Sequence, residues 1–434
     1  MDKNDKDSKL IQKCIDISCL EKKDLNHKIF SIGWKNTLAN WKDKLKYNII
    51  RFNSKFDMPR GKINLFNKKY DSNNKSEKQN FYKKFSNIIM VTYRSKYRPQ
   101  INIKNNKEYT SDCGWGCMIR SSQMILCRAL YKIFKYKLNQ KDNLTYKIVP
   151  FIMENYLNIN EKEYFGMNDY INKLKSYGKK DIVEIDPPFS IHKICILGEK
   201  YGRACGEWFS DFELPKIYNT INEVFSIIPD LSIIHFNSTI ELNTILNRCF
   251  KEKNDLNNNL NNDNNIINEN EIEIDKKIYS MEKMGLIFVS NRLGLDNISP
   301  EYFPSLKNLF VCKECIGLIG GKKHSNSASY FIGYYENNLL YLDPHHNNPT
   351  VSVLDETSIN TYINKTLYEL NLKTLNPAFT IGFLFRNIKE FKNLLLFFEN
   401  IKKEENSCFG YSKASNNDKN YNEIINKISM KNDF

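Results

Sequence analysis

The clearest periodic pattern in the chain is a run of apolar and small residues that begins at Met118. Its members recur three or four positions apart, which is the spacing of one face of an α-helix. The pattern therefore predicts a long helix with one buried face. The residues on that face are Met118, Ser122, Ile125, Leu126, Ala129, Leu130 and Ile133.

The second half of the chain has a different pattern, with short apolar runs separated by polar turns from Gly285 onward. Such runs are typical of β-strands, and Glu336-Asn-Asn338 predicts a hairpin turn between two of them. An amphipathic helix is expected at about 388–402. A helix-rich half followed by an antiparallel-sheet half belongs to the α+β class. The expected strands are 286–289, 316–319, 330–335, 339–342 and 378–385, with an earlier one at 88–94.

Four polar segments interrupt these patterns. Residues 1–28 have mixed charge and few apolar positions, which predicts a flexible N-terminal arm or a short helix. Residues 67–80 have almost nothing to bury and predict a mobile loop. The Asn-rich stretch 251–277 predicts a disordered insertion, and residues 403–434 predict a flexible tail. The ordered domain is therefore expected at 29–402.

Composition narrows the classes of function. A hydrophobic content of 41% is typical of globular proteins, and no run approaches the length of a membrane span. The lysines behind the net charge of +14 are spread through Asn-rich segments without a compact basic motif. We therefore interpret the charge as a solvated surface with weak attraction to membranes, and we expect no nucleic-acid partner. The eleven cysteines are scattered and odd in number, and no secretory signal opens the chain. These features favour reduced thiols and a cytoplasmic protein.

The first candidate for chemistry is Thr110-Ser-Asp-Cys-Gly-Trp-Gly-Cys-Met-Ile-Arg120. Cys117 falls in the first turn of the predicted helix, after a turn that Gly114 and Gly116 make possible. A helix N-terminus favours the thiolate form of a cysteine, and its free N–H groups can stabilise an oxyanion. The competing interpretation is an inert core cysteine, because most cysteines are buried and unreactive.

The second candidate is Asp343-Pro344-His345, at the end of a predicted strand. Side chains two positions apart in an extended segment point to the same face, so Asp343 and His345 can lie side by side. A carboxylate beside an imidazole orients it as a base for activating a thiol. The alternative is a simple strand-ending turn. Because the chain has only six histidines, a histidine placed beside an aspartate at a strand end favours the catalytic interpretation. His346 points to the other face and is the weaker candidate.

Other motifs in the chain do not predict a metal or a cofactor. Cys312-Lys-Glu-Cys315 has no second cysteine or histidine pair with zinc-site spacing. The glycine-rich stretch Gly317-Leu-Ile-Gly-Gly-Lys322 lacks the spacing of a phosphate-binding loop. We therefore expect a catalytic site without a metal and a protein without a cofactor.

The two candidate motifs occur together with five others in the order that resembles the autophagins, a family of papain-like cysteine peptidases that process the autophagy ubiquitin-like modifier. The resemblance implies a papain-like fold with a small inserted helical, fingers-like subdomain at about 146–232. The motifs are Val91-Thr-Tyr-Arg94, the stretch 110–120, Gly206-Glu-Trp208, Arg292-Leu-Gly-Leu-Asp296, Ile319-Gly-Gly-Lys322, Ser329-Tyr-Phe-Ile-Gly333 and Leu342-Asp-Pro-His345.

The resemblance also implies residue roles. Cys117 would be the nucleophile, His345 the general base and Asp343 the group that orients the imidazole. The hydroxyl of Tyr93 would complete the oxyanion hole, and Trp208 would cover the cleft.

A loop that contacts substrate and shields the cysteine would start at Gly320, Gly321 and Lys322. Two positions depart from the family pattern: Lys323 stands where a proline is usual, and Ser329 stands where a histidine is common.

The implied reaction is acyl transfer through a thioester at the C-terminal glycine of the modifier. It would remove residues after that glycine or release the modifier from phosphatidylethanolamine, which requires transient membrane proximity. Tyr421 and Ile424 fit the aromatic-x-x-aliphatic pattern of partner motifs that bind by strand addition. Two alternatives stay open at this point: an inactive relative that binds the modifier, and a basic protein that binds nucleic acid or membranes.

Overall fold

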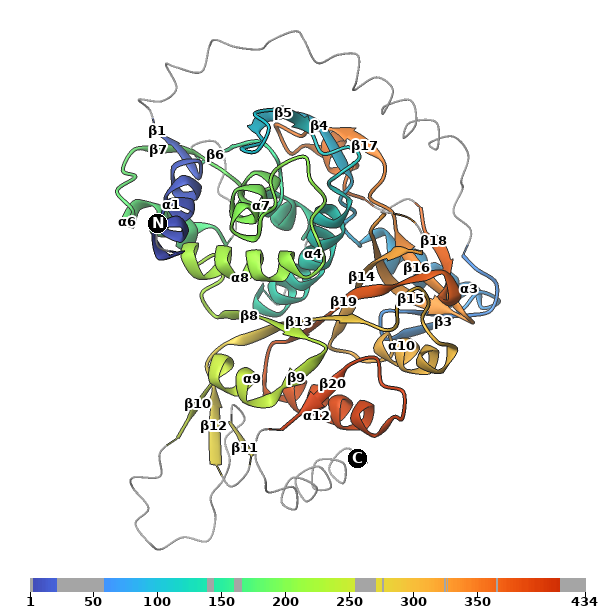
Figure 1. Cartoon of the computed structure of the whole chain (residues 1–434). Coiled ribbons are helices and arrows are strands. Elements are labelled where there is room, and N and C mark those ends of the chain that lie inside the picture. Colours follow the sequence, from blue (N-terminus) through green and yellow to red (C-terminus); the bar gives the residue numbers. More distant parts are fainter. Residues whose placement is uncertain are drawn as a thin grey trace, which may run out of the picture.

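The protein has a mixed α/β fold around one large sheet (Figure 1). The computed structural model describes residues 3–21, 58–138, 144–159, 166–253, 271–274, 277–323, 325, 327–363 and 366–413. Within these residues the sheet has nine strands, of which β8 pairs in parallel with β13 and the other neighbours pair antiparallel. Its main order is β18 (Tyr368–Asn371), β16 (Asn338–Leu342), β15 (Ser329–Tyr335), β14 (Cys315–Lys322), β19 (Leu375–Phe385), β13 (Met284–Arg292) and β8 (Leu231–Asn237). Strands β2 (Lys62–Leu65) and β3 (Lys68–Asp71) extend it beside β15.

Both faces of this sheet are buried, which explains why its strands have such continuous apolar sequences. Along β13, Leu286 and Phe288 enter one hydrophobic core, whereas Ile287 and Val289 enter the other. This alternation follows from the two-residue period of a strand. The predicted strands 286–289, 316–319, 330–335, 339–342 and 378–385 are all confirmed, and each lies inside an observed strand.

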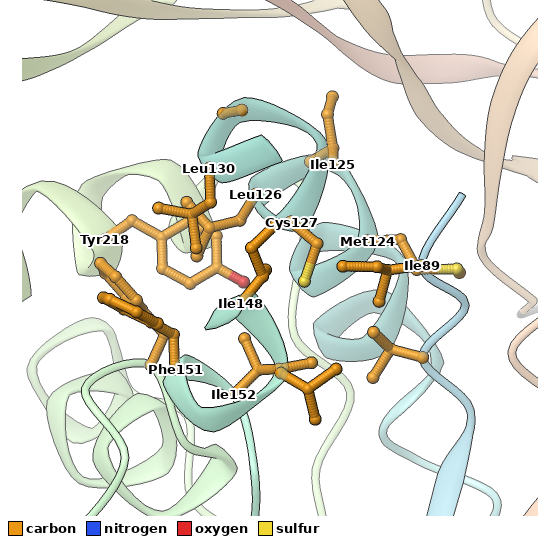
Figure 2. Packing of buried hydrophobic residues seen from close by; sticks show 14 of the residues in the cluster. Ile89, Met124, Ile125, Leu126, Cys127, Leu130, Ile148, Phe151, Ile152 and Tyr218 are labelled. Atoms are coloured by element: carbon orange, nitrogen blue, oxygen red, sulfur yellow. The ribbon is translucent and has the colours of Figure 1, made fainter. Parts of the chain in front are cut away.

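The first core is built around α4 (Cys117–Leu138), the predicted long helix. Figure 2 shows Leu126, Leu130 and Cys127 of α4 packing against Ile148 and against Tyr218 of α8 (Glu213–Phe225). Each fully buried apolar side chain of this kind contributes roughly 1.5–3 kcal/mol to the free energy of folding. The helix is therefore fixed along its length, and so is the position of Cys117 at its first turn.

Other helices cover each face of the sheet (Figure 1). On the α4 side lie α6 (Asn168–Ser176), α7 (Ile191–Gly198) and α8 (Glu213–Phe225), and on the opposite side lie α9 (Leu242–Cys249), α10 (Phe303–Leu309) and α12 (Ile388–Lys403). The helices of 146–232 share the core of α4, so the structure does not distinguish them as an inserted subdomain. No described helix is long and apolar enough to cross a membrane.

Two segments expected to be mobile are built into the fold. Residues 3–21 of the predicted flexible arm form α1 (Lys3–Asp16) and β1 (Cys19–Glu21), and β1 pairs with β7 (Ile182–Ile185). Of the two alternatives predicted for this part, an arm or a short helix, the structure shows the helix, and burial of Cys14 and Ile15 explains why it is not a free arm.

The loop predicted at 67–80 is wrong, because β3 and α3 (Lys75–Ser86) occupy most of that segment. The Asn74 side chain caps α3, and Phe81 and Phe85, four positions apart, bury one face of that helix.

The ends of two further polar segments are ordered as well. The described edges of the 251–277 insertion belong to β10 (Phe250–Glu252), β11 (Glu271–Ile274) and β12 (Lys277–Met281), which pair as a small sheet. The start of the predicted tail forms β20 (Gly410–Ser412), which pairs with β9 (Thr239–Glu241). Cys408 and Phe409 are buried there, which anchors residues 404–413.

The strand expected at 88–94 begins only at Tyr93, as β4 (Tyr93–Ile101), because the residues before it make one isolated bridge instead of a ladder. It pairs with β5 (Glu108–Ser111) and β17 (Asn347–Pro349). Other short elements include β6 (Leu157–Asn158), α5 (Thr145–Ile148) and α11 (Glu356–Ile359).

Candidate active site

Strand β4 links the two candidate motifs, because it pairs with β5, which ends at Ser111 before the cysteine turn, and with β17, which follows Asp343-Pro-His345. Strand β17 pairs in parallel with β4, with Asn347 opposite Tyr93. The backbone N–H of Tyr93 also donates to the carbonyl of Pro344 at 3.0 Å. The Asp-Pro-His segment is thereby held beside the start of β4, although more than two hundred residues separate them in the sequence.

The cysteine lies in a small buried cluster of its own. Cys117 packs with Tyr93 and Ala328, and all three are almost fully buried. The ring of Tyr93 meets the ring of His345 edge to face, with 5.4 Å between the ring centroids. Thus the expected nucleophile, base and oxyanion-hole residue lie within one site.

A glycine turn presents Cys117 at the start of α4. Gly114 has a φ of +89°, a conformation that side chains with a Cβ rarely adopt. A Cβ on Gly116 would lie 2.5 Å from an Asp112 carboxylate oxygen, so no larger residue fits there. The N–H of Gly116 donates to the Asp112 carbonyl at 2.8 Å. These constraints explain the Gly-Trp-Gly sequence before the cysteine.

A fully buried charge network anchors that turn. The Arg120 guanidinium donates to Asp112 at 2.6 Å and to Glu154 at 2.6 Å, and the Asp112 carboxylate also accepts the N–H of Arg94 at 2.7 Å. Burial alone lowers the pKa of Arg120, but the two carboxylates outweigh it and raise that pKa. The sequence pattern contained Asp112 and Arg120 but gave neither of them a role.

The predicted pair of Asp343 and His345 is in contact. One Asp343 carboxylate oxygen bonds His345 Nδ1 and accepts the His345 backbone N–H at 3.0 Å. Burial lowers the pKa of His345, but its hydrogen bonds with Asp343 and with the Cys117 side chain outweigh that effect and raise the pKa to about 9. The imidazolium form of His345 is therefore favoured near neutral pH. His346 turns away and bonds the hydroxyl of Tyr368 at 3.0 Å.

A cavity of about 210 Å³ opens onto Cys117. Trp208, whose side chain is half exposed, forms part of its wall and donates its indole N–H to the Gly114 carbonyl at 2.9 Å. This bond ties the tryptophan to the turn that presents the cysteine. Trp115, Met118 and Phe209 also line the cavity.

The three residues expected in the glycine loop have different positions. Gly321 lines the cavity, and a Cβ there would lie 2.4 Å from the Ser327 carbonyl. Gly320 is buried in the sheet between Ser329 and β19. Lys322 is exposed at the end of β14 and is not part of the cavity wall. Only one of the three therefore faces the space beside Cys117.

Sequence reasoning missed Asp211 as part of the cavity wall. Asp211 lines the cavity, and its carboxylate accepts a hydrogen bond from the Thr380 hydroxyl at 3.0 Å. Burial raises the pKa of Asp211. Thr380 also bonds Ser290 at 2.6 Å, and Ser290 bonds His235 at 2.9 Å. No local pattern could have indicated this chain of contacts, because its four members come from four separate segments.

Two expectations about ligands concern other parts of the chain. Tyr421 and Ile424 of the expected partner motif lie outside the described residues. In the part of the chain that the structure describes, no group of three or more His, Cys, Asp or Glu residues could hold a metal ion.

Comparison with known proteins points to one family. Residues 78–396 match the Peptidase C54 catalytic domain. The chain is 28% identical over 337 residues to "Cysteine protease ATG4B" of Oryza sativa subsp. indica, which covers 74% of this chain and 61% of that protein. It is 25% identical over 403 residues to "Cysteine protease ATG4D" of Xenopus laevis, covering 85% and 76%. It is 23% identical over 350 residues to "Probable cysteine protease atg4" of Aspergillus niger, covering 75% and 74%. The match thus spans less than two thirds of the rice protein.

Proposed function

Because the chain belongs to the Peptidase C54 family of cysteine proteases, we propose that it cleaves an autophagy ubiquitin-like modifier after its C-terminal glycine. One observation carries the proposal. A cysteine at a helix N-terminus shares a buried site with an imidazole that a carboxylate orients. We further propose that the fold is papain-like, with α4 supplying the nucleophile and the sheet supplying the base.

The proposed mechanism follows from the contacts of Cys117. Its thiolate attacks the glycine carbonyl carbon, and a tetrahedral oxyanion forms. The N–H of Cys117 and the hydroxyl of Tyr93 stabilise that oxyanion. The imidazolium of His345 then protonates the leaving amine and a thioester remains. Water, deprotonated by the neutral imidazole, hydrolyses the thioester, while Asp343 keeps the ring in its productive orientation.

The shape of the cavity supports a preference for glycine. Its volume of about 210 Å³ is small for a ligand site, and Trp208 and Gly321 bound it. A side chain on the residue whose carbonyl is attacked would have to enter this space. We therefore propose that Trp208 and Gly321 select for a glycine at that position.

Two reactions would use the same chemistry. One removes residues that follow the glycine in the precursor, and the other releases the modifier from phosphatidylethanolamine at a membrane. The protein would act in the cytoplasm and contact membranes transiently. Tyr421 and Ile424 would add a strand to the modifier and increase its local concentration.

The test is cleavage of a modifier precursor that carries a C-terminal extension. Wild-type protein is expected to release the extension after the glycine, which intact mass spectrometry of the product identifies. Cys117→Ala is expected to bind the precursor without cleaving it. If folded wild-type protein binds the modifier but leaves it intact, the proposal is wrong and the chain is a noncatalytic relative.

A further inference from the structure

A second cavity, of about 510 Å³, lies near the opposite end of α4 from Cys117. Lys135, in the last turn of α4, lines it, and eighteen residues at about 1.5 Å each place it roughly 27 Å along the helix from the cysteine. The cavity is formed by β3, α3 and the end of α4. We call it the lysine pocket, and its lysines are Lys68, Lys69, Lys83, Lys84 and Lys135.

The charge of the lysine pocket is poorly compensated. Glu77 is the one carboxylate in its lining, and that side chain already accepts the backbone N–H of Asp71 at 2.6 Å. Among the residues that the structure describes, none of the five lysines forms an ion pair with a carboxylate. Five ammonium groups thus surround one carboxylate.

Helix ends account for only part of this cluster. Lys83 and Lys84 lie in the last turn of α3, and Lys135 lies in the last turn of α4, where lysines balance the partial negative charge of a helix C-terminus. Lys68 and Lys69, however, come from β3, which has no comparable dipole. Capping of helices therefore does not explain the whole set.

A further cation lies close to the pocket. The Arg128 guanidinium stacks over the ring of Phe66 at 4.1 Å, its Nε lacks a hydrogen-bond partner, and within the described chain it has no carboxylate partner. Burial, followed by the charges of Arg128, Lys135, Lys68 and Lys132, lowers the pKa of Lys84 to about 7. The protein therefore holds positive charges together that repel one another, and an anion would relieve that repulsion.

We propose that the lysine pocket binds a ligand that carries several phosphate groups, of the class of inositol polyphosphates and phosphoinositide headgroups. Lysine is a common partner of phosphate, whose oxygens accept charge-assisted hydrogen bonds. Several phosphates fit better than one, because the lysines stand on three separate elements around the cavity. The site is distinct from the cavity at Cys117, and its occupation does not depend on the proposed peptidase activity.

The test is isothermal titration of the full chain with inositol hexakisphosphate at physiological ionic strength. The test variant is Lys83→Gln/Lys84→Gln. The matched control is Lys402→Gln/Lys403→Gln, which makes the same double substitution at adjacent exposed lysines in the last turn of another helix, α12. We expect binding by wild-type and control protein, and affinity weaker by about tenfold or more in the test variant. Circular dichroism verifies that both variants fold.

Vesicles of phosphatidylcholine with and without phosphatidylinositol bisphosphate identify the source of the phosphates. If the wild-type protein sediments with the phosphoinositide vesicles and Lys83→Gln/Lys84→Gln does not, the result supports a lipid headgroup as the ligand. If the protein binds the soluble probe alone, the result supports a soluble ligand. Absence of binding to either probe by wild-type protein overturns the proposal. Equal weakening in the α12 control also overturns it, because net charge would then be the cause.

Discussion

Replacing Asp343 by Asn tests how the site activates its cysteine. The substitution keeps the size of the side chain but removes the negative charge that bonds His345 Nδ1. In the wild-type protein, the hydrogen bonds with Asp343 and Cys117 raise the pKa of His345 from 6.5 to about 9, against the opposing effect of burial. That net difference corresponds to about 3 kcal/mol in favour of the imidazolium, after the opposing effect of burial.

The direction of the pH effect follows from the charge that is lost. In the proposed mechanism the active form pairs an imidazolium with a thiolate, so activity should fall when the pH rises above the pKa of His345. Without the carboxylate, that pKa moves down toward its ordinary value. We expect the alkaline limb of the kcat/KM profile to shift to lower pH by about one unit or more. We also expect the maximum rate to fall by roughly 10²- to 10⁴-fold, because the imidazole loses its orientation.

The assay is cleavage of the extended modifier precursor across a pH series. His346→Ala is the matched control, since His346 bonds Tyr368 and faces away from the site. The control should keep both the rate and the pH profile of the wild type. If Asp343→Asn cleaves at the wild-type rate with an unmoved alkaline limb, the assigned role of Asp343 is wrong.

Three further changes test other parts of the structure. Trp208→Phe keeps an aromatic ring but loses the bond to Gly114, so kcat/KM for the precursor should fall roughly threefold to tenfold; an unchanged value would contradict a positioning role for that bond. Arg120→Met leaves two carboxylates buried without their partner and should cost about 3–5 kcal/mol in urea unfolding, whereas an unchanged midpoint would refute the importance of this network. Because folding lowers the pKa of Lys84 from 10.5 to about 7, the unfolded chain binds more protons than the folded chain between those two pH values. The free energy of unfolding of the wild type should therefore gain a contribution from Lys84 as the pH rises from 7 to 10.5. Lys84→Met should lack this contribution in thermal unfolding, and identical pH dependence in both proteins would contradict it.

Much of the fold could be predicted from local pattern. The hairpin turn expected at 336–338 is confirmed, because β15 ends at Tyr335 and β16 begins at Asn338. Polar and short elements could not be predicted in the same way. Strand β3 buries only Tyr70, and its pairing with β2 stabilises it more than its own sequence does. The pairing of β20 with β9 joins segments about 170 residues apart, which no local period reveals.

In the candidate site, too, the residues with a local sequence signal could be predicted, whereas their tertiary contacts could not. Cys117 and the pair of Asp343 and His345 each had a local signal, namely a glycine turn before a helix and an i, i+2 spacing in an extended segment. Their meeting depends on the pairing of β17 with β4, which is a tertiary contact. The Asp211 wall of the cavity has no sequence signal, because it is defined by the fold alone.

The most direct test of the account is to trap the nucleophile. The full chain is incubated with modifier in which propargylamine replaces the C-terminal glycine, so that an alkyne carbon stands where the attacked carbonyl carbon would be and the thiol adds to it as a vinyl thioether. The adduct is located by peptide mass spectrometry. We predict one adduct on Cys117, absent in Cys117→Ala, slowed in His345→Ala and unchanged in Cys113→Ala. An adduct on Cys113, or none on folded wild-type protein, would contradict the central claim.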